Sequence, residues 1–285
     1  MTDETPLTSD NEYQIDFNFQ QVPSALAVDI PSEAAAAMLH ITPAQFNSYA
    51  AFALADCKRI ARELLESPRN TAAIEKLKRP RTGTTSTVMT IGDSITTYRY
   101  GYAEILGALL ELVAPAQPVQ FYNHGRSGYT STHGLEHTFT QCLAQKPDWV
   151  FLKYGVNDTK RFGGAMGKLL VSSQEYAHNM AHIIDALLSV GAHVVILTPT
   201  PVIEAIVNAN PDFQAMAMTW DNRDILAYAN VLNDIGTARG VPVIDLMSIF
   251  TVKPDPSLHL PDGLHPGPVG HRIIIEQVLK TVDDL

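Results

Sequence analysis

Two short polar motifs hold the residue types that acyl transfer by a serine requires. Gly92-Asp93-Ser94 follows an apolar run, which predicts that Ser94 lies at the carboxyl end of a buried strand. Asp262 and His265 lie three residues apart near the other end of the sequence, and this spacing lets the carboxylate orient the imidazole. Turns rich in glycine, aspartate and serine also end many strands that have no catalytic role. Taken together, the two motifs predict a nucleophile, a base and an orienting acid.

Two further turns offer hydrogen-bond donors for an oxyanion. Gly128 ends the segment 123–128, and Asn157 lies in the segment 155–158. We expect the backbone N–H groups of Ser94 and Gly128 and the side-chain amide of Asn157 to form an oxyanion hole. The glycine keeps a bulky side chain away from the approaching substrate. In the predicted reaction Ser94 attacks an ester carbonyl, and His265 takes its proton and returns it to the leaving alcohol.

The order of the predicted elements explains how these turns could meet. From residue 86 onward, strand-like apolar runs alternate with amphipathic helices, which predicts a three-layer α/β/α sandwich around a mainly parallel five-stranded sheet. The polar turns then follow the carboxyl ends of strands, where open α/β sheets place their sites. We expect strands at 88–91, 119–122, 149–154, 194–198 and 241–245, and helices at 102–113, 132–145, 173–190, 220–239 and 268–282.

The four motifs resemble, in order, the four sequence blocks of the SGNH hydrolases, also called the GDSL esterase and lipase family. The resemblance covers about residues 86–284 and implies a flavodoxin-like SGNH hydrolase fold that needs no metal and no cofactor. It also implies that Ser94 is the nucleophile, that His265 and Asp262 are its base and acid, and that Gly128 and Asn157 are oxyanion donors. The chain departs from the family's pattern at Ile95, where leucine is usual, and at Val156, where a glycine is common.

The sequence before this region predicts two segments. Residues 1–21 are acidic and polar, and we expect a disordered tail there; residues 22–84 are expected to form a helical appendage to the catalytic domain 85–285. Within the appendage, Thr42-Pro43-Ala44-Gln45 begins a long helix with a capping threonine and an early proline. Ser67-Pro68 ends that helix, and a shorter one is expected at 71–78. The appendage could serve as a lid, a dimer contact or a buttress.

Composition narrows the class of protein. Hydrophobic residues make up 46% and charged residues 18% of the chain, which is typical of a soluble globular protein, and no apolar run is long enough to span a bilayer. A formal net charge of −10 argues against nucleic-acid binding. No secretory signal pattern is visible. Cys57 and Cys142 are far apart, which favours free buried thiols and a cytoplasmic location.

Other residues in the sequence offer rival sites. Ser127 almost fits the Gly-x-Ser-x-Gly nucleophile elbow, but Tyr129 replaces the last glycine. His259, His265 and His271 recur every six residues, a spacing that does not suit metal ligands. We expect His271 in the first turn of the last helix, His259 at the rim of the site, and three other histidines at the surface or in turns, namely His124, His133 and His137.

Three segments near the motifs allow either packing or a part in the site. Tyr98, Arg99, Tyr100 and Tyr102 follow the nucleophile motif and could line its pocket or pack. The glycine-containing segment 159–171 could be a mobile loop or a passive connector. The apolar residues of 199–219 could form an acyl pocket, although core packing is the more common role of such residues.

We therefore expect a serine-dependent carboxylic-ester hydrolase that forms an acyl-enzyme intermediate and acts on short acyl groups, acetyl in particular. Nothing in the sequence indicates a long lipid groove. The expected partner is a small-molecule ester, with acylated carbohydrates among the candidates. Thioester hydrolysis or acyl transfer to a sugar would use the same residues. A non-catalytic carbohydrate-binding module would be expected to have lost one of them, and none is lost.

Overall fold

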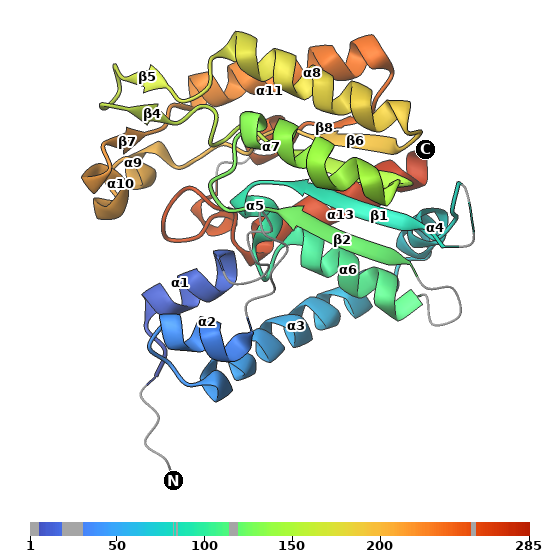
Figure 1. Ribbon diagram of the computed structural model, residues 1–285, viewed down its shortest axis with the longest axis horizontal. Coiled ribbons are helices and arrows are strands. Elements are labelled where there is room, and N and C mark those ends of the chain that lie inside the picture. Colours follow the sequence, from blue (N-terminus) through green and yellow to red (C-terminus); the bar gives the residue numbers. More distant parts are fainter. Residues whose placement is uncertain (1–5, 19–30, 82, 84, 114–118, 252–254) are drawn as a thin grey trace.

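A five-stranded parallel sheet forms the centre of the molecule (Figure 1). The computed structural model describes residues 6–18, 31–81, 83, 85–113, 119–251 and 255–285. The strand order is β2-β1-β3-β6-β8, and every neighbouring pair in this sheet is parallel. The predicted five-stranded sheet is therefore confirmed. Its strands are β1 (Thr87–Gly92), β2 (Gln120–Gly125), β3 (Trp149–Lys153), β6 (His193–Leu197) and β8 (Val243–Ile244).

Helices cover both faces of the sheet because strand side chains alternate between them. Met89, Ile91 and Val150 pack against the helices of one face, whereas Val88 and Phe151 pack against those of the other. The predicted three-layer α/β/α sandwich is confirmed. The first face carries α7 (Ser131–His137), the π-helical turn η1 (Thr138–Cys142), η2 (Leu143–Gln145), α8 (Ser173–Ser189) and α11 (Asn222–Arg239); the second carries α6 (Tyr102–Val113), α12 (Leu246–Thr251) and α13 (Pro268–Asp284).

The strand register brings three of the polar turns to one edge of the sheet. Gly92, the last residue of β1, pairs with Gly125 at the end of β2 and with Lys153 at the end of β3. The chain therefore leaves all three strands at the same level. Ser94, the segment 126–128 and Asn157 all follow these ends directly, which explains why motifs so distant in sequence meet in space.

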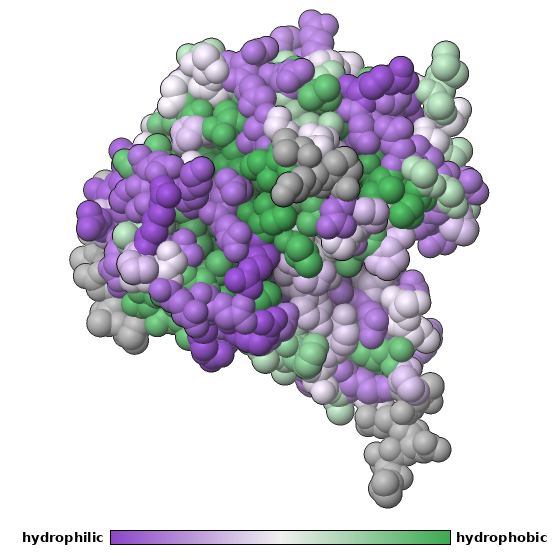
Figure 2. Space-filling view, turned by 180° about the vertical axis from the view of Figure 1, so that it is seen from behind, coloured by the Kyte–Doolittle hydropathy of each residue, from purple (hydrophilic) through white to green (hydrophobic). Residues whose placement is uncertain are grey.

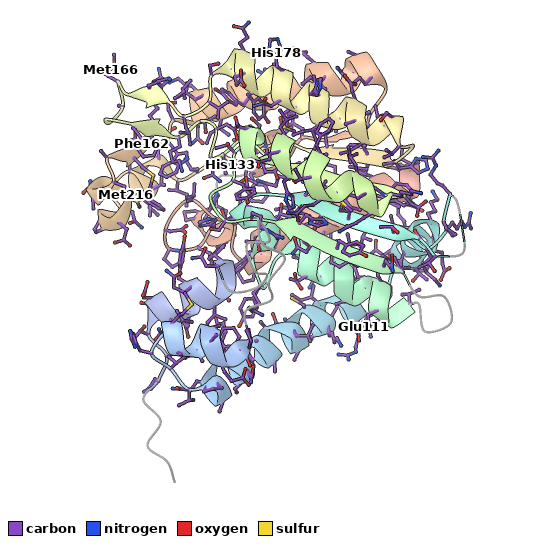
Figure 3. All side chains as sticks on the ribbon, viewed as in Figure 1. Glu111, His133, Phe162, Met166, His178 and Met216 are labelled. Carbon is purple, nitrogen blue, oxygen red and sulfur yellow. The ribbon has the colours of Figure 1, made fainter. Side chains whose placement is uncertain are left out.

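A second, three-stranded antiparallel sheet was not predicted. It has the order β5-β4-β7 and consists of β4 (Arg161–Phe162), β5 (Lys168–Leu169) and β7 (Met218–Thr219). It joins the glycine-containing segment 159–171 to the segment that holds α9 (Glu204–Val207) and α10 (Pro211–Ala215). Phe162, Met166 and Met216 lie on this projecting part (Figure 3), and Met166 is 97% exposed. Strands of two residues carry no periodicity that a sequence pattern could reveal.

Two of the N-terminal helices pack into the main core. α3 (Pro43–Leu65) begins at the predicted cap, where Thr42 and Gln45 form a reciprocal capping box, and it packs along α6. α4 (Pro68–Leu77) packs along α13, and a shorter helix, α2 (Ser32–Met38), packs on α3. Buried side chains such as Leu64 and Ile74 belong to the same hydrophobic cluster as the sheet residues of that face.

The first described segment is a helix rather than a disordered tail. α1 (Ser9–Phe17) begins at Thr8, whose side chain accepts the Asn11 N–H. Its buried residues are Ile15, Asp16 and Phe17. The prediction of disorder over 1–21 is therefore wrong for this helix, while residues 1–5 and 19–21 lie outside the described residues. α1 adjoins the loops at the end of the sheet that carry Ser94 and His265 (Figure 1).

The thiols and the surface complete the description of the chain. Cys57 and Cys142 are both buried and free, as the sequence predicts. None of the helices within the described residues is long and apolar enough to cross a membrane. Seen from behind, the molecule has hydrophilic residues over much of its face and hydrophobic ones gathered toward the middle (Figure 2).

Candidate active site

A tight turn at the end of β1 positions Ser94. Ser94 is the first residue of the short helix α5 (Ser94–Thr97), and Asp93 caps this helix by accepting the Ile95 N–H at 3.0 Å. No side chain fits at Gly92, because a Cβ there would lie 2.6 Å from the backbone O of Lys153. The glycine and the aspartate of the motif therefore shape the turn, and the serine side chain is left for chemistry.

Ser94, His265 and Asp262 form a continuous hydrogen-bonded chain. The Oγ of Ser94 lies 2.9 Å from Nε2 of His265, and Nδ1 of His265 lies 2.5 Å from Oδ2 of Asp262. Ser94 is 5% exposed and His265 2%. With its proton on Nδ1, a neutral imidazole donates to Asp262 and offers its Nε2 lone pair to the serine hydroxyl. The structure thus brings together the three residues that the sequence motifs singled out.

The loop around Asp262 fixes the carboxylate and keeps it ionised. Its Oδ1 accepts the backbone N–H groups of Leu264 at 2.8 Å and His265 at 3.0 Å. Burial opposes ionisation, but the charge of His265, the hydrogen bond from its ring and the two backbone hydrogen bonds hold the pKa of Asp262 below its ordinary value. A carboxylate in this state can stabilise an imidazolium at neutral pH.

Gly128 and Asn157 follow the ends of the two strands that flank β1. Gly128 has a φ of +77°, a conformation that favours glycine, and a Cβ built there would meet no atom within 4 Å. The space beside its Cα is therefore open. The Asn157 amide donates to the Tyr129 carbonyl O at 3.1 Å, and this bond uses one of its two N–H donors. Both groups can serve an oxyanion near Ser94.

The unusual residue Val156 does not disturb this loop. Its side chain is buried in the core, and its carbonyl O accepts hydrogen bonds from Trp220 Nε1 at 3.0 Å and from Thr159 Oγ1 at 2.9 Å. A larger residue at the usual glycine position is therefore accommodated by core packing, and Asn157 keeps its place at the strand end.

Asn123 ties the end of β2 to the nucleophile turn. Its side-chain Nδ2 donates to the Thr96 carbonyl O at 3.2 Å and to Glu104 at 2.8 Å, and its Oδ1 accepts the Gly125 N–H at 2.9 Å. Burial raises the pKa of Glu104. One amide thus spans two strand ends and α6, a positioning role that its place in the glycine-rich motif did not reveal.

A fully buried ion pair lies beneath the nucleophile turn. Lys153 Nζ lies 3.6 Å from Asp93 Oδ2, and both side chains are 0% exposed. Burial lowers the pKa of Lys153, while the charge of Asp93 opposes this shift. His271 is buried nearby in the first turn of α13, as predicted, and its Nδ1 accepts the Tyr102 N–H at 3.1 Å. Burial lowers the pKa of His271 to about 3, with smaller effects from Lys153 and His265, so the ring is neutral.

The structure separates the rival residues from the hydrogen-bonded chain of Ser94, His265 and Asp262. His259 is partly buried, and its Nε2 lies 2.9 Å from the Pro201 carbonyl O. Tyr102 is buried against Thr96. Within the described part of the chain, no hydrogen bond joins Ser127 to a histidine. Tyr98 stacks on Phe17, whose ring contacts that of His265. The segment 199–219 meets the loop between Asp262 and His265, where the Ile203 N–H donates to the Gly263 carbonyl O at 2.8 Å.

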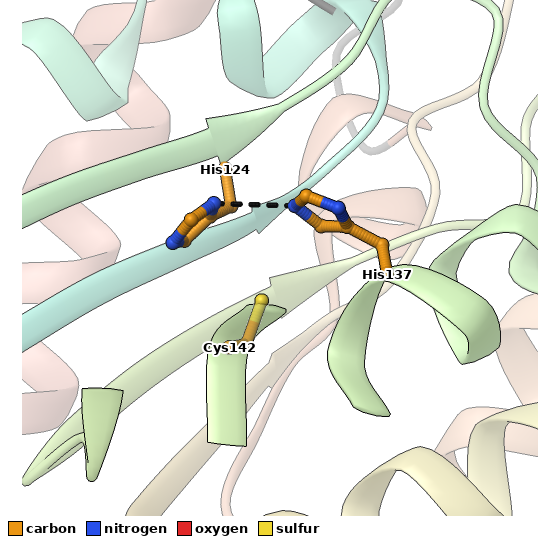
Figure 4. Close-up of side chains that lie close together, drawn as sticks. All are labelled: His124, His137 and Cys142. Carbon is orange, nitrogen blue, oxygen red and sulfur yellow. Dashed lines mark hydrogen bonds between the residues drawn. The ribbon is translucent and has the colours of Figure 1, made fainter. Parts of the chain in front are cut away.

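His124, His137 and Cys142 form a buried group at the meeting of β2, α7 and η1 (Figure 4). The prediction that His124 and His137 are surface or turn residues is wrong: both are buried, and His124 Nδ1 lies 3.2 Å from His137 Nε2. They are buried because β2 and α7 face one another here. His133, in contrast, is exposed at the start of α7.

Two imidazoles and a thiolate would suit a soft metal ion. The protonated thiol and the neighbouring Arg126 charge, however, oppose the binding of a cation here. Burial lowers the pKa of both imidazoles, that of His137 to about 4, and the charge of Arg126 lowers them further. Burial also raises the pKa of the Cys142 thiol to about 12. A cation would have to displace the thiol proton next to the buried Arg126 guanidinium. A neutral hydrogen-bonded pair beside a thiol accounts for the three residues.

Sequence reasoning missed the contribution of α1. The Phe17 ring lies 4.5 Å from the His265 ring and stacks at 4.9 Å on Tyr98, while Tyr13 meets His265 edge-on at 6.2 Å, all measured between centroids. The available signal was the four-residue spacing of Tyr13 and Phe17, which puts two aromatic rings on one helix face. The polar residues around Tyr13 and Phe17 favoured the prediction of a disordered tail instead.

Comparisons with known proteins agree with the fold. A profile of the GDSL-like lipase/acylhydrolase family matches residues 90–273. The isoamyl acetate-hydrolyzing esterase 1 homolog of Mus musculus is 25% identical over 208 residues, which cover 69% of this chain and 81% of that protein. The acetylxylan esterase of Geobacillus stearothermophilus is 24% identical over 187 residues, which cover 64% of this chain and 80% of that one.

Solved structures show the same architecture. The lipase/acylhydrolase of Enterococcus faecalis matches with a TM-score of 0.55 and 21% identity, over 70% of this chain and 96% of that one. A catalytic mutant of the Geobacillus stearothermophilus acetylxylan esterase matches with a TM-score of 0.54 and 21% identity, over 71% and 96% of the two chains.

Proposed function

The chain belongs to the GDSL-like lipase/acylhydrolase family and is an esterase of the SGNH type, and from that premise we propose that it hydrolyses carboxylic esters through an acyl-enzyme formed on Ser94. The observation that carries the proposal is the hydrogen-bonded chain from Ser94 through His265 to Asp262. Gly128 and Asn157 follow the neighbouring strand ends, where two oxyanion donors are needed.

The reaction proceeds in two balanced steps. His265 Nε2 takes the Ser94 hydroxyl proton as Oγ attacks the ester carbonyl, and the N–H groups of Ser94, Gly128 and Asn157 stabilise the oxyanion. Collapse of this intermediate expels the alcohol, which receives the proton from His265 and leaves the acyl group on Oγ. Water then attacks the acyl-enzyme with His265 as base, and Ser94 leaves with that proton. Asp262 stabilises the imidazolium in both steps.

Short acyl groups, acetyl in particular, are the proposed substrates. The mouse relative is named for hydrolysis of isoamyl acetate and the Geobacillus relative for acetylxylan, and both names describe acetyl esters. An acylated carbohydrate therefore remains within the proposed class. The near-complete burial of Ser94 and His265 also favours a small substrate, because it leaves little room beside the reacting atoms.

The test is hydrolysis of p-nitrophenyl acetate by the protein and by Ser94→Ala. We expect Ser94→Ala to lower kcat by about 10⁴ or more while the far-UV circular dichroism and Tm stay unchanged. Ser127→Ala, which changes the rival serine, should keep most of the activity. A fluorophosphonate reagent should label the peptide that contains Ser94, as read by mass spectrometry. Retained activity in Ser94→Ala, or labelling only at another residue, would refute the proposal.

A further inference from the structure

The helix α1 covers one face of the His265 imidazole, a contact that the hydrolytic reaction itself does not require. Phe17 is 3% exposed, and its ring lies between His265 and Tyr98, with centroid distances of 4.5 and 4.9 Å. Ring pairs at such distances are favourable contacts. Because Ser94 is also nearly buried, a substrate must reach its Oγ past the residues that surround the His265 ring.

Polar anchors from two parts of the molecule hold the end of α1 over the site. The Arg99 guanidinium donates to the Ile15 carbonyl O from Nε at 3.2 Å and Nη2 at 3.1 Å, and the Arg99 backbone N–H donates to the Asp16 carbonyl O at 3.1 Å. From α3, the Tyr49 hydroxyl donates to Asp16 Oδ2 at 3.1 Å. The ring of Phe17 is therefore held in place by both the loop after α5 and the N-terminal helices.

The end of α1 also forms a wall of a small cavity next to the segment that carries Gly128. The cavity has a volume of about 90 Å³, and its lining residues are Phe17, Asn18, Thr97, Gly125, Arg126, Ser127 and Tyr129. Gly128 itself does not line the cavity but lies in sequence between the lining residues Ser127 and Tyr129, and the Tyr129 carbonyl O accepts the Asn157 amide. A cavity of this size suits a short acyl chain better than a long one.

We propose that this cavity is the acyl pocket of the enzyme and that Phe17 of α1 is the residue that limits acyl length. The inference rests on the proposed function, since it assigns the acyl group of the ester that Ser94 attacks. Phe17 acts here by its size: its ring closes the pocket toward α1, and a longer acyl chain would have to displace the ring from His265 and Tyr98. The first described helix of the chain thereby sets the selectivity of a site otherwise built by the sheet.

The experiment compares kcat/KM for p-nitrophenyl acetate, butyrate, hexanoate and octanoate in the full-length protein and in Phe17→Ala. We expect the unmodified protein to prefer acetate and butyrate. Each methylene that gains a buried site is worth about fourfold in binding, so Phe17→Ala should raise the octanoate-to-acetate ratio at least about tenfold. Phe17→Leu, which keeps an apolar side chain against Tyr98, should give a smaller rise in the same direction.

Asn11→Ala is the matched control. Asn11 lies on the same helix, does not line the cavity and donates to the Leu39 carbonyl O at 3.0 Å, so its replacement removes a contact of α1 but leaves the Phe17 ring and its anchors at Ile15 and Asp16 in place. We expect this variant to leave the octanoate-to-acetate ratio unchanged. An unchanged ratio in folded Phe17→Ala and Phe17→Leu would overturn the proposal, and so would an equal rise in Asn11→Ala. If Phe17→Ala fails to fold, the ratio in Phe17→Leu decides. Loss of the serine mechanism itself would appear separately, as activity that persists in Ser94→Ala.

Discussion

Replacing Asp262 with asparagine tests whether the carboxylate sets the tautomer of His265. The asparagine Oδ1 can still accept the N–H groups of Leu264 and His265, which bind Oδ1 in the aspartate. The amide nitrogen, however, takes the place of Oδ2, 2.5 Å from His265 Nδ1. Because an amide N–H₂ group donates, Nδ1 must then accept. The imidazole proton moves to Nε2, which faces Ser94 Oγ and can no longer act as the base.

The expected loss follows from this reversal. A wrong tautomer lowers kcat by about 10⁴ in comparable serine sites, which corresponds to about 5 kcal/mol of transition-state stabilisation. The loop should remain folded, since both of its backbone hydrogen bonds to position 262 persist. KM should change little, because the carboxylate does not face the substrate.

Steady-state hydrolysis of p-nitrophenyl acetate, with Tm measured on the same samples, checks the expectation. Asp255→Asn is a matched control, because Asp255 also accepts a loop N–H, that of Ser257, outside the active site; its kcat should stay unchanged. A kcat for Asp262→Asn within about tenfold of the unmodified value would refute the reasoning. The orientation of His265 would then depend on something other than this carboxylate.

Two further predictions concern stability. Lys153→Met should lower the free energy of unfolding in urea by about 3 to 5 kcal/mol, because it leaves the Asp93 carboxylate buried without its partner. Adding Asp93→Asn, which still caps α5, should restore much of the lost stability. An unchanged free energy of unfolding in Lys153→Met would contradict a stabilising ion pair. Burial raises the pKa of Asp16 from its ordinary 3.8 to about 7, so the folded chain keeps this proton after the unfolded chain has released it, and stability falls as pH rises from about 4 to 7. Asp16→Asn should therefore narrow the difference in Tm between pH 5 and pH 8. Burial also raises the pKa of Asp158 to about 7, so the part of the pH dependence of Tm that is due to Asp158 should remain. If Asp16→Asn and the unmodified protein show the same Tm difference, the effect ascribed to Asp16 is wrong.

The strand-end residues could be predicted because each follows a strong local pattern. Ser94 and Asn157 come directly after apolar runs that form β1 and β3, and a parallel sheet must bring such ends to one edge. The cap at Thr42 was visible for a similar reason, since the capping box lies within four residues. Local signals of this kind need no knowledge of distant partners.

Other features depend on contacts that no local pattern encodes. Phe17 is buried against His265, 248 positions later in the numbering, and a nine-residue helix with a buried aspartate does not resemble an amphipathic helix in sequence. The His124 and His137 pair joins β2 to α7, so neither residue alone indicated its burial. The buried pair of Lys153 and Asp93 likewise joins residues 60 positions apart in the numbering, and no local pattern pointed to it.

The shared core of α3, α4 and the sheet means that the unit of homology and the unit of folding differ in this protein. Family similarity spans residues 90–273, but Leu64 and Ile74 lie in the same hydrophobic cluster as Val88 and Val282. A domain excised at the borders of similarity would lack the first residues of β1 and most of α13, and it would expose the apolar face of α6 to water. A chimera with a relative would therefore have to keep α3 and α4 together with the catalytic sheet in order to fold.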